Sequence, residues 1–433
     1  MPVLDAIKGA AERLLVEREL EAFLRTCRRL LSARGEANSA AHAATALRHY
    51  GELSEPAQLR FFEHLEDDFG PDPKQVLQSA QQYAADPTAP LLMQLTAAAE
   101  PPRQELLRRL NRAPGGTAVI VQMRRQLLRV LPSHSRLAAV EADFCHLLSS
   151  WFNPGFLEMQ QVDWNSAAQL LEKIIQHEAV HAIDGWDDLR RRLQPDRRCF
   201  AFFHPQLPEE PLIFVEVALG PTMPDAVAPL IQKGTQPIDV KQFKVATFYS
   251  ISNCQPGLRG VSLGNFLIKR VAERLHAEFA SIRTFCTLSP IPGFVRWLDR
   301  PDAADIVPKA VQMKVRAARD ALGLDEARML DRTANWKPEA ATTAERNALL
   351  QLASIYLRVI SPTDQGDPVA KFHLGNGARL QRINWAADLS KNGLRQSCGM
   401  MVNYLYDLAK VEEYHERFLE GDVVHAQAVA RLV

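Results

Sequence analysis

Apolar residues recur at steps of three and four along the first ~150 residues, which is the spacing of a helix with one buried face. The run AAERLLVERELEAFLRTCRRLLSA (residues 10–33) shows this periodicity most clearly. The run SEPAQLRFFEHLEDDFG (54–70) starts with a capping serine, and PPRQELLRRLNRAPGG (101–116) opens on prolines and closes at glycines. No β-rich run or catalytic motif interrupts these signals. The pattern predicts a helical bundle used for packing or subunit contact.

The pattern changes after residue 156, where short runs rich in Val, Ile, Phe and Tyr appear between Pro, Gly and Asn. Four runs predict strands: CFAFFHP (199–205), PLIFVEVAL (211–219), KVATFYSIS (244–252) and IRTFCTLS (282–289). The amphipathic run SLGNFLIKRVAERLHAEF (262–279) predicts a long helix between the last two strands. Helical patterns return over 303–360, and the C-terminal stretch is mixed. We therefore predict an α+β protein, with an all-α domain over 1–152 and a mixed α/β catalytic domain over 153–433.

Composition and charge are those of an ordinary globular protein and argue against a nucleic-acid or membrane partner. The 433 residues are 47% apolar, with 51 basic and 51 acidic side chains. A nucleic-acid binder normally carries a basic excess, and no apolar run approaches the ~20 residues of a membrane span, so we expect neither partner. Acidic residues at positions 5, 12, 17 and 19 argue against a targeting peptide, and we expect a cytoplasmic location. The six cysteines include no C-x-x-C pair, which is typical of a reducing compartment.

The segment HEAVH (residues 177–181) matches H-E-x-x-H, the zinc-binding pattern of many metalloproteases. Its surroundings have helical periodicity, and on a helix His177 and His181 would share one face. The extended motif is absent, because Asp184 and Asp187 stand where it has Gly and His. Glu209 or Glu210 could serve as a distant third ligand, but the segment LPEEP is typical of a solvated hairpin turn. A zinc peptidase therefore remains an alternative function, while surface or capping histidines are the simpler interpretation, and we expect no metal.

The segment GVSLG (260–264) fits the G-x-S-x-G nucleophile elbow of α/β-hydrolases and precedes a predicted helix. The elbow requires the strand to run directly into a strained turn. Here the residues NCQPGLR lie between the strand and the turn, and a loop of that length would remove the strain. A glycine-bearing loop between a strand and a helix also suits a pyrophosphate, because the backbone can approach the ligand and the helix start presents free N–H groups. Arg259, Lys269 and Arg270 are near in sequence to meet the phosphates. An ordinary strand–loop–helix connection is the remaining interpretation.

The residues RGVSLG resemble the coenzyme A loop of the acetyltransferase (GNAT) superfamily, with Ser262 where a glycine is usual. Longer stretches are similar to the malonyl-CoA decarboxylase family: FYSISNCQPGLRGVSLGNFLIKRV, TLSPIPGFVRWL, FHLGNGARLQRINWAAD and SCGMMVNYLYDL. The resemblance covers most of residues 151–410. It implies an acetyltransferase-like catalytic domain, a helical domain that assembles a homo-oligomer (dimer or tetramer), and cofactor-independent decarboxylation of malonyl-CoA to acetyl-CoA and CO₂. An acyl-CoA-dependent N-acetyltransferase of the same superfamily is the alternative.

The resemblance also implies roles for particular residues. Ser289 would be the proton acceptor that orients the malonyl carboxylate, and His373 would donate a proton to the thioester enolate. The malonyl-CoA loop would consist of Arg259, Gly260, Val261, Ser262, Leu263, Gly264 and Asn265, with Tyr406 near the site. The family often has an acidic residue in place of Ser262, but backbone contacts from the loop do not depend on that side chain. From the residues alone, Ser289 would be a loop-capping hydroxyl and His373 a satisfied histidine before a Gly-Asn-Gly turn.

Overall fold

The structure is a computed structural model that describes residues 2–32, 38–261, 263, 267–324 and 327–433. Its tertiary contacts divide the chain into two compact units. The first unit comprises Met1–Glu158, Phe203–Pro211 and Gln255–Leu263. The second comprises Met159–Phe202, Leu212–Cys254 and Gly264–Val433. Two short stretches that are distant in sequence therefore pack with the N-terminal region.

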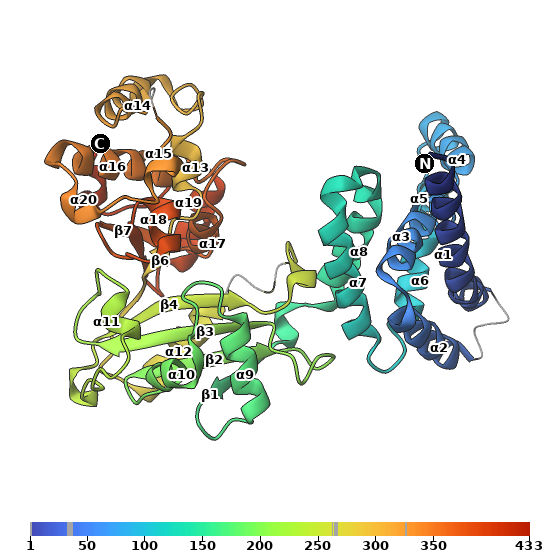
Figure 1. Ribbon diagram of the computed structural model, residues 1–433, viewed down its shortest axis with the longest axis horizontal. Helices are drawn as coiled ribbons and strands as arrows, with labels where there is room; N and C mark the ends of the chain where they lie inside the picture. The colour runs from blue at the N-terminus through green and yellow to red at the C-terminus, as the bar shows by residue number, and fades with distance from the viewer. Residues whose placement is uncertain (1, 33–37, 262, 264–266, 325–326) are drawn as a thin grey trace. The chain divides into compact units, whose positions relative to one another are not determined.

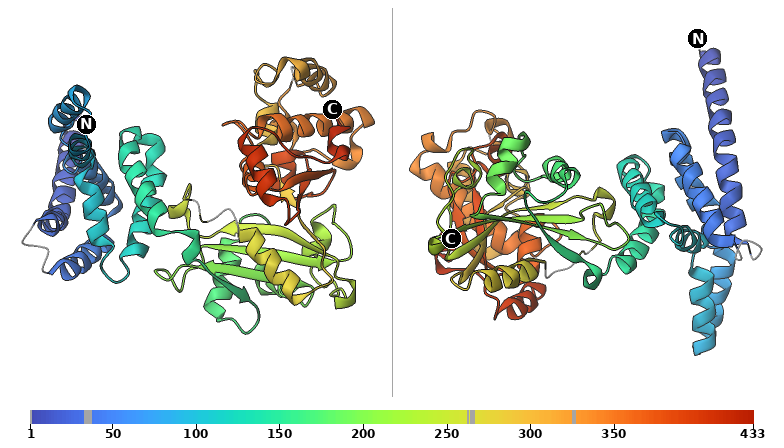
Figure 2. Two further views of the ribbon diagram at one scale, coloured as in Figure 1. Left: turned by 180° about the vertical axis from the view of Figure 1, so that it is seen from behind. Right: turned by 90° about the horizontal axis from the view of Figure 1, so that it is seen from below.

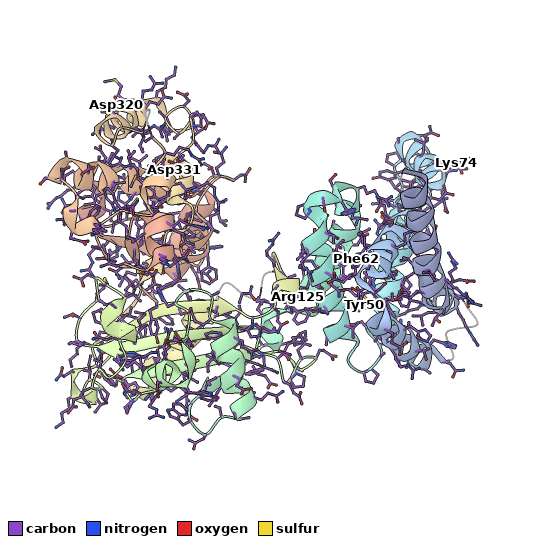
Figure 3. The ribbon with its side chains drawn as sticks, in the orientation of Figure 1. Tyr50, Phe62, Lys74, Arg125, Asp320 and Asp331 are labelled. Carbon is purple, nitrogen blue, oxygen red and sulfur yellow. The ribbon has the colours of Figure 1, made fainter. Side chains whose placement is uncertain are left out.

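The first unit is built from helices (Figure 1): α1 (Pro2–Leu31), α2 (Ser39–Glu52), α3 (Glu55–Asp67), α4 (Pro73–Ala85), α5 (Ala89–Ala99), α6 (Pro102–Leu110), α7 (Gly116–Val130) and α8 (Ala138–Trp151). Apolar side chains at the predicted spacing form its core, and an aromatic cluster joins α1, α2 and α3. In this cluster the ring of Phe61 lies 4.8 Å from that of Phe23 and 5.7 Å from that of Tyr50, between ring centroids. Phe62, labelled with Tyr50 in Figure 3, adjoins Phe61. The predicted helical bundle is confirmed.

A glycine and a buried arginine attach the segment 255–263 to α7. The Arg124 guanidinium donates to the carbonyl oxygen of Gly257 at 2.8 Å and to Glu141 Oε1 at 2.6 Å. A Cβ atom on Gly257 would lie 2.1 Å from the carbonyl oxygen of Val121. We expected a glycine of this loop to let the backbone approach a ligand closely. At Gly257 the backbone instead approaches α7 closely.

The second unit is organised on a mixed sheet with the strand order β1-β2-β3-β4-β5-β8-β6, and β7 pairs with β8. Its strands are β1 (Glu158–Val162), β2 (Arg197–Phe203), β3 (Ile213–Gly220), β4 (Val245–Asn253), β5 (Thr284–Thr287), β6 (Ser289–Pro290), β7 (Arg379–Asn384) and β8 (Met401–Tyr406). β4 and β5 pair in parallel, whereas the other pairs from β2 to β8 are antiparallel. A parallel pair requires a crossover, and α12 (Leu267–Glu278) provides it.

Helices cover both sides of this sheet. α12 lies along one face of β2–β4, as Figure 2 shows, and its Lys269 lies 3.9 Å from Glu412 in the C-terminal part of the chain. The remaining helices are α9 (Ala168–His177), α10 (Gly185–Arg192), α11 (Ala228–Ile231), α13 (Phe294–Leu298), α14 (Lys309–Ala321), α15 (Met329–Arg332), α16 (Thr343–Ile355), α17 (Pro368–Gly375), α18 (Lys391–Ser397), α19 (Val411–Leu419) and α20 (Gln427–Ala430). The predicted α+β class and the four predicted strands are confirmed.

The prediction that HEAVH lies on a helix is wrong. α9 ends at His177, where Glu178 takes an extended conformation, and α10 starts only at Gly185. The two histidines therefore do not share a helical face. The cause is tertiary, because Glu178 forms hydrogen bonds to β4 that continuation of the helix would not permit.

No helix in the described part of the chain combines the length and the apolar character needed to cross a bilayer.

Replacing Gly257 by Ala should lower the free energy of unfolding by about 1–3 kcal/mol, because the added methyl group must displace the backbone of α7. Urea denaturation followed by circular dichroism measures the change. Gly51 of α2 has no atom within 4 Å of its Cβ position, so Gly51→Ala is the matched control and should be neutral or slightly stabilising. Equal effects of the two substitutions would contradict this packing account.

Candidate active site

Ser289 lies where the centre of the sheet passes into a loop. β5 ends at Thr287, and Ser289 opens the short strand β6, where it pairs with Val402 of β8. The Ser289 hydroxyl donates to Thr287 Oγ1 at 2.8 Å, and the same Thr287 oxygen accepts the backbone N–H of Tyr404 at 3.2 Å. Ser289 and Thr287 are both buried. The serine oxygen is therefore held in one place against the central strands.

His373 completes a chain of hydrogen bonds that begins at this serine. The histidine lies on α17, and its Nε2 is 2.9 Å from Ser289 Oγ. Its Nδ1 is 2.9 Å from the hydroxyl of Tyr406. Because Ser289 donates to Thr287, the serine oxygen accepts from Nε2–H, and Nδ1 accepts the Tyr406 proton; this assignment follows from the network of partners. The structure thus brings together three predicted site residues: Ser289, His373 and Tyr406.

Aromatic rings enclose the imidazole. The His373 ring stacks on Tyr404, with ring centroids 4.7 Å apart and planes inclined by 28°, and Phe372 meets it edge-on. Tyr404 and Tyr406 are two residues apart on β8, so their side chains lie on the same side of the sheet. Burial lowers the pKa of His373 to about 3, so the imidazole is neutral at physiological pH. Burial also raises the pKa of Tyr406 well above its usual value.

One carboxylate ties the helix of His373 to the loop of Ser289. Asp367 caps α17, since its Oδ1 accepts the backbone N–H groups of Val369 at 2.9 Å and Ala370 at 3.0 Å. Its Oδ2 accepts the N–H of Gly293 at 2.8 Å, and Gly293 lies four residues after Ser289. Burial raises the pKa of Asp367, while the three backbone hydrogen bonds act in the opposite direction. Asp367 was not among the predicted site residues, although Asp-Pro before a helical run is a sequence signal for a helix N-cap.

A cavity of about 420 Å³ opens beside Ser289 and His373. Its other lining residues include Val180, Ile213, Phe248, Ser250, Pro368 and Phe372. The wall is mostly apolar, which favours binding of an organic molecule and limits access of water to the serine–histidine pair.

The acidic residue of HEAVH builds part of this cavity wall. The Glu178 carboxylate accepts hydrogen bonds from Ser250 Oγ at 2.7 and 2.8 Å, from Ser252 Oγ at 3.2 Å, and from the backbone N–H groups of Val180 and His181. Because Val180 and Ser250 both line the cavity, this carboxylate fixes the wall in place. Sequence reasoning missed Ser250, although two serines alternating with apolar residues on β4 indicate a polar spot on one face of the strand.

The histidines of the motif do not converge on a metal site. His181 is buried, which lowers its pKa, and its Nε2 has no hydrogen-bond partner among the described residues. Within the described ranges, no group of three or more His, Cys, Asp or Glu side chains could hold a metal ion.

The predicted malonyl-CoA loop is described only in part. Arg259, Gly260, Val261 and Leu263 are described, whereas Ser262, Gly264 and Asn265 lie outside the described residues. Gly260 has φ +82°, a backbone conformation that favours glycine, and Arg259 is exposed. Val261 and Leu263 are buried. These four residues belong to the first unit, and the Ser289–His373–Tyr406 group belongs to the second. The G-x-S-x-G elbow prediction also falls on Ser262 and so lies outside the described residues.

The second unit thus belongs to a recognisable class, α+β proteins built on a mixed sheet, with a hydrogen-bonded serine–histidine pair at the wall of an apolar cavity. Sequence comparison specifies the class further. Residues 155–433 match the malonyl-CoA decarboxylase C-terminal domain, and residues 69–152 match the malonyl-CoA decarboxylase N-terminal domain. The chain therefore belongs to the malonyl-CoA decarboxylase family.

Curated relatives and solved structures agree with this assignment. The mitochondrial malonyl-CoA decarboxylase of Mus musculus is 34% identical over 83% of this chain and 78% of its own length. That of Anser anser anser is 35% identical over 71% of this chain, and the match spans 64% of the goose protein. The crystal structure of malonyl-CoA decarboxylase from Rhodopseudomonas palustris is 45% identical, with a TM-score of 0.83 over 95% of this chain and 99% of that chain. The one from Agrobacterium vitis is 43% identical, with a TM-score of 0.82 over the same shares.

The neutral, buried state of His373 should make stability depend on pH. The unfolded chain binds a proton at this histidine below pH ~6.5, whereas the folded chain does so only near pH 3, so stability falls as the pH drops between these values. At pH 5 the loss from this group should be about 2 kcal/mol relative to pH 7.5. Urea denaturation at both pH values should show that His373→Gln reduces the difference by about this amount.

The matched control is Tyr404→Phe, which alters the ring stacked on His373 but removes no group that titrates between pH 5 and pH 7.5. It should keep the pH dependence of the unaltered protein. If His373→Gln also keeps it, His373 is not the buried neutral group described here.

Proposed function

We propose that this protein decarboxylates malonyl-CoA to acetyl-CoA and CO₂ without an organic cofactor or metal. Family membership supports the reaction, and the 2.9 Å contact between Ser289 Oγ and His373 Nε2 at the wall of an apolar cavity is the observation that carries the mechanism. The curated relatives and solved structures named above are themselves called malonyl-CoA decarboxylases.

The chemistry needs little more than this geometry. Loss of CO₂ leaves the electron pair of the broken C–C bond on the carbon next to the thioester, and the thioester carbonyl accepts it as an enolate. The enzyme must keep water away from the carboxylate, stabilise the enolate and deliver a proton to carbon. An apolar cavity with the Ser289 hydroxyl and the His373 imidazole at its wall provides these functions.

Ser289 is proposed to orient the substrate, and His373 is proposed to donate the proton. Ser289 donates its hydroxyl hydrogen, which Thr287 Oγ1 accepts in the empty site, to the malonyl carboxylate and so orients it. A negative carboxylate entering beside His373 favours the protonated imidazole, because an opposite charge stabilises the charged form. When CO₂ leaves, the negative charge moves to the enolate, and the proton on Nε2 transfers to carbon. The proton taken up with the substrate remains on Nδ1, so the imidazole is again in the neutral state that its burial favours, and exchange with solvent restores the proton on Nε2.

Tyr406 is proposed to position the histidine. Its hydroxyl holds Nδ1 at 2.9 Å, which leaves Nε2 as the nitrogen that faces Ser289 and the cavity. The loop of residues 259–265 is proposed to bind the coenzyme A portion through its backbone. The exposure of Arg259 and the left-handed backbone of Gly260 support that role.

Purified protein should release acetyl-CoA and CO₂ from malonyl-CoA, measured by chromatography of the acyl-CoA products. Ser289→Ala and His373→Gln should each lower kcat by about 100-fold or more, because each removes a group that acts on the reacting atoms. Tyr406→Phe should lower kcat less, because it removes only the bond that orients the ring.

Ser281→Ala is the matched control, since this serine lies just before β5 and does not line the cavity. Its turnover should equal that of the unaltered protein. Coenzyme A should still raise the melting temperature of the Ser289 and His373 variants. Absence of turnover in the unaltered protein would contradict the decarboxylase function, whereas undiminished turnover in both site variants would contradict only the assigned residues. Consumption of acetyl-CoA dependent on an added amine would indicate an acetyltransferase.

We also propose that the helical region, residues 1–152, assembles the protein into a homo-oligomer, with the catalytic domain over 153–433. The α4–α5 hairpin supports this, because α5 is rich in apolar residues and buries none of them within the chain. Leu77 is 60% exposed and Met93 is 73% exposed on these helices. A group of exposed apolar side chains of this kind is typical of a contact surface.

The double substitution Leu77→Glu and Met93→Glu should reduce the mass of the assembly, because charges would have to be buried at the contact. Light scattering after size exclusion measures the mass. Met313→Glu alters an equally exposed methionine of the second unit and should leave the mass unchanged. A monomeric unaltered protein, or a double variant with undiminished mass, would contradict this assignment of the contact.

A cytoplasmic location is proposed as well. The six cysteines form no disulfide bonds, and five of them are buried. Free buried thiols are typical of proteins in a reducing compartment.

A further inference from the structure

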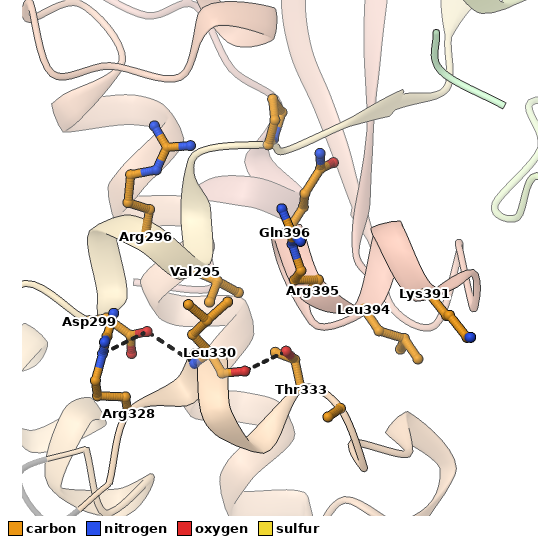
Figure 4. A pocket seen from close by; sticks show the side chains of 12 residues that line it. Val295, Arg296, Asp299, Arg328, Leu330, Thr333, Lys391, Leu394, Arg395 and Gln396 are labelled. Carbon is orange, nitrogen blue, oxygen red and sulfur yellow. Dashed lines mark hydrogen bonds and ion pairs between the residues drawn. The ribbon is translucent and has the colours of Figure 1, made fainter. Parts of the chain in front are cut away.

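A second cavity, of about 940 Å³, lies in the second unit and shares no lining residue with the cavity at Ser289. Its walls come from α13, from the segment around α15 and from α18 (Figure 4). This volume is at the upper end of the range for small-molecule sites. The proposed decarboxylation does not use this cavity.

The cavity is strongly cationic. Four basic side chains line it: Arg296, Arg328, Lys391 and Arg395. All four are exposed and can reorient toward a ligand. Arg296, Lys391 and Arg395 form no ion pair with any carboxylate in the described ranges. Because the chain as a whole has equal numbers of basic and acidic side chains, this concentration of positive charge is local.

The one carboxylate in the wall does little to offset this charge. The Asp299 side chain is only 4% exposed, and it accepts the backbone N–H groups of Met329 at 2.6 Å and Leu330 at 3.0 Å. Arg328 lies 3.8 Å from it, at the limit of an ion pair (Figure 4). Asp299 is therefore committed to holding the start of α15, and the cationic groups remain available to an anion.

Apolar side chains lie among these cations. Val295 of α13, Leu330 of α15 and Leu394 of α18 line the same cavity, and Leu330 is 39% exposed. A bare inorganic anion would leave the exposed parts of Leu330 and Leu394 in water. A ligand that combines an apolar or aromatic body with several negative charges would cover them and satisfy the cations.

We propose that this cavity binds an organic polyphosphate with an aromatic body, the chemical class of a nucleoside triphosphate. Guanidinium groups match phosphate oxygens in a two-pronged geometry, and three of the four cations are arginines. The apolar residues receive the base and ribose. Pro292, three residues after Ser289, also lines the cavity, so the ligand would contact the segment that carries this serine.

Titration calorimetry with ATP at low ionic strength tests the proposal. The full-length protein should bind ATP at one cavity per chain, and the affinity should fall as salt is added. The double substitution Arg296→Ala and Arg395→Ala should weaken binding at least tenfold and leave malonyl-CoA turnover unchanged. Both side chains are exposed, so the fold should persist, which the melting temperature checks.

Lys309→Ala with Lys337→Ala is the control pair, because both lysines are exposed in the same unit and neither lines the cavity. This pair should bind ATP like the unaltered protein. Inorganic pyrophosphate provides only phosphate groups, and adenosine provides only the base and ribose. Each should bind more weakly than ATP. The proposal is overturned if ATP does not bind, if the arginine pair and the lysine pair behave alike, or if pyrophosphate binds as tightly as ATP.

Discussion

The serine–histidine pair depends on one buried carboxylate that touches neither residue. Asp367 receives two N–H groups at the start of the helix that carries His373 and one N–H group from the loop that follows Ser289. The helix and the loop are more than 70 residues apart in sequence, and this carboxylate is their shared anchor. The residue that approaches Asp367 is a glycine, and this position requires one, because a side chain there would collide with the hydroxyl of Tyr356. The 2.9 Å contact between Ser289 and His373 thus rests on one buried side chain that holds two backbone segments together.

Burial decides the chemistry of the site. An imidazole enclosed by Tyr404, Tyr406 and Phe372 is neutral, and it can acquire a proton only when a negative charge enters beside it. A malonyl carboxylate would supply that charge. The same apolar surroundings that suppress protonation in the empty site would limit access of water to the reacting carbon. Exclusion of water thus keeps the imidazole neutral in the empty site and would also protect the reacting carbon.

The two cavities of the second unit differ in charge. The cavity at Ser289 is mostly apolar, with a serine and a neutral histidine as its reactive groups, whereas the cavity at α13 and α18 concentrates cations. Ser289 and Pro292 belong to one short segment, and each lines a different cavity.

Local patterns were sufficient for much of the architecture. The helical first third and the four strand-forming runs follow from hydrophobic periodicity, which reflects which face of each element is buried. Ser289, His373 and Tyr406 were identified through resemblance over long stretches, because nothing in their immediate neighbours distinguishes a reactive serine from a capping one. Their hydrogen-bond chain, and the roles of Thr287 and Asp367, come from contacts between segments that are distant in sequence.

HEAVH marks the limit of local patterns most clearly. Its periodicity is that of a helix, yet the chain leaves the helix at His177 because the Glu178 carboxylate accepts from two serines of β4 and from the backbone N–H groups of Val180 and His181. The two serine donors reach this carboxylate only once the sheet has formed. The sequence alone determined the helical first third, the four strand-forming runs between residues 199 and 289, and which family the chain resembles. The tertiary structure alone decided which buried polar groups meet, because a buried carboxylate or imidazole takes its partner from whatever folding brings within hydrogen-bond distance.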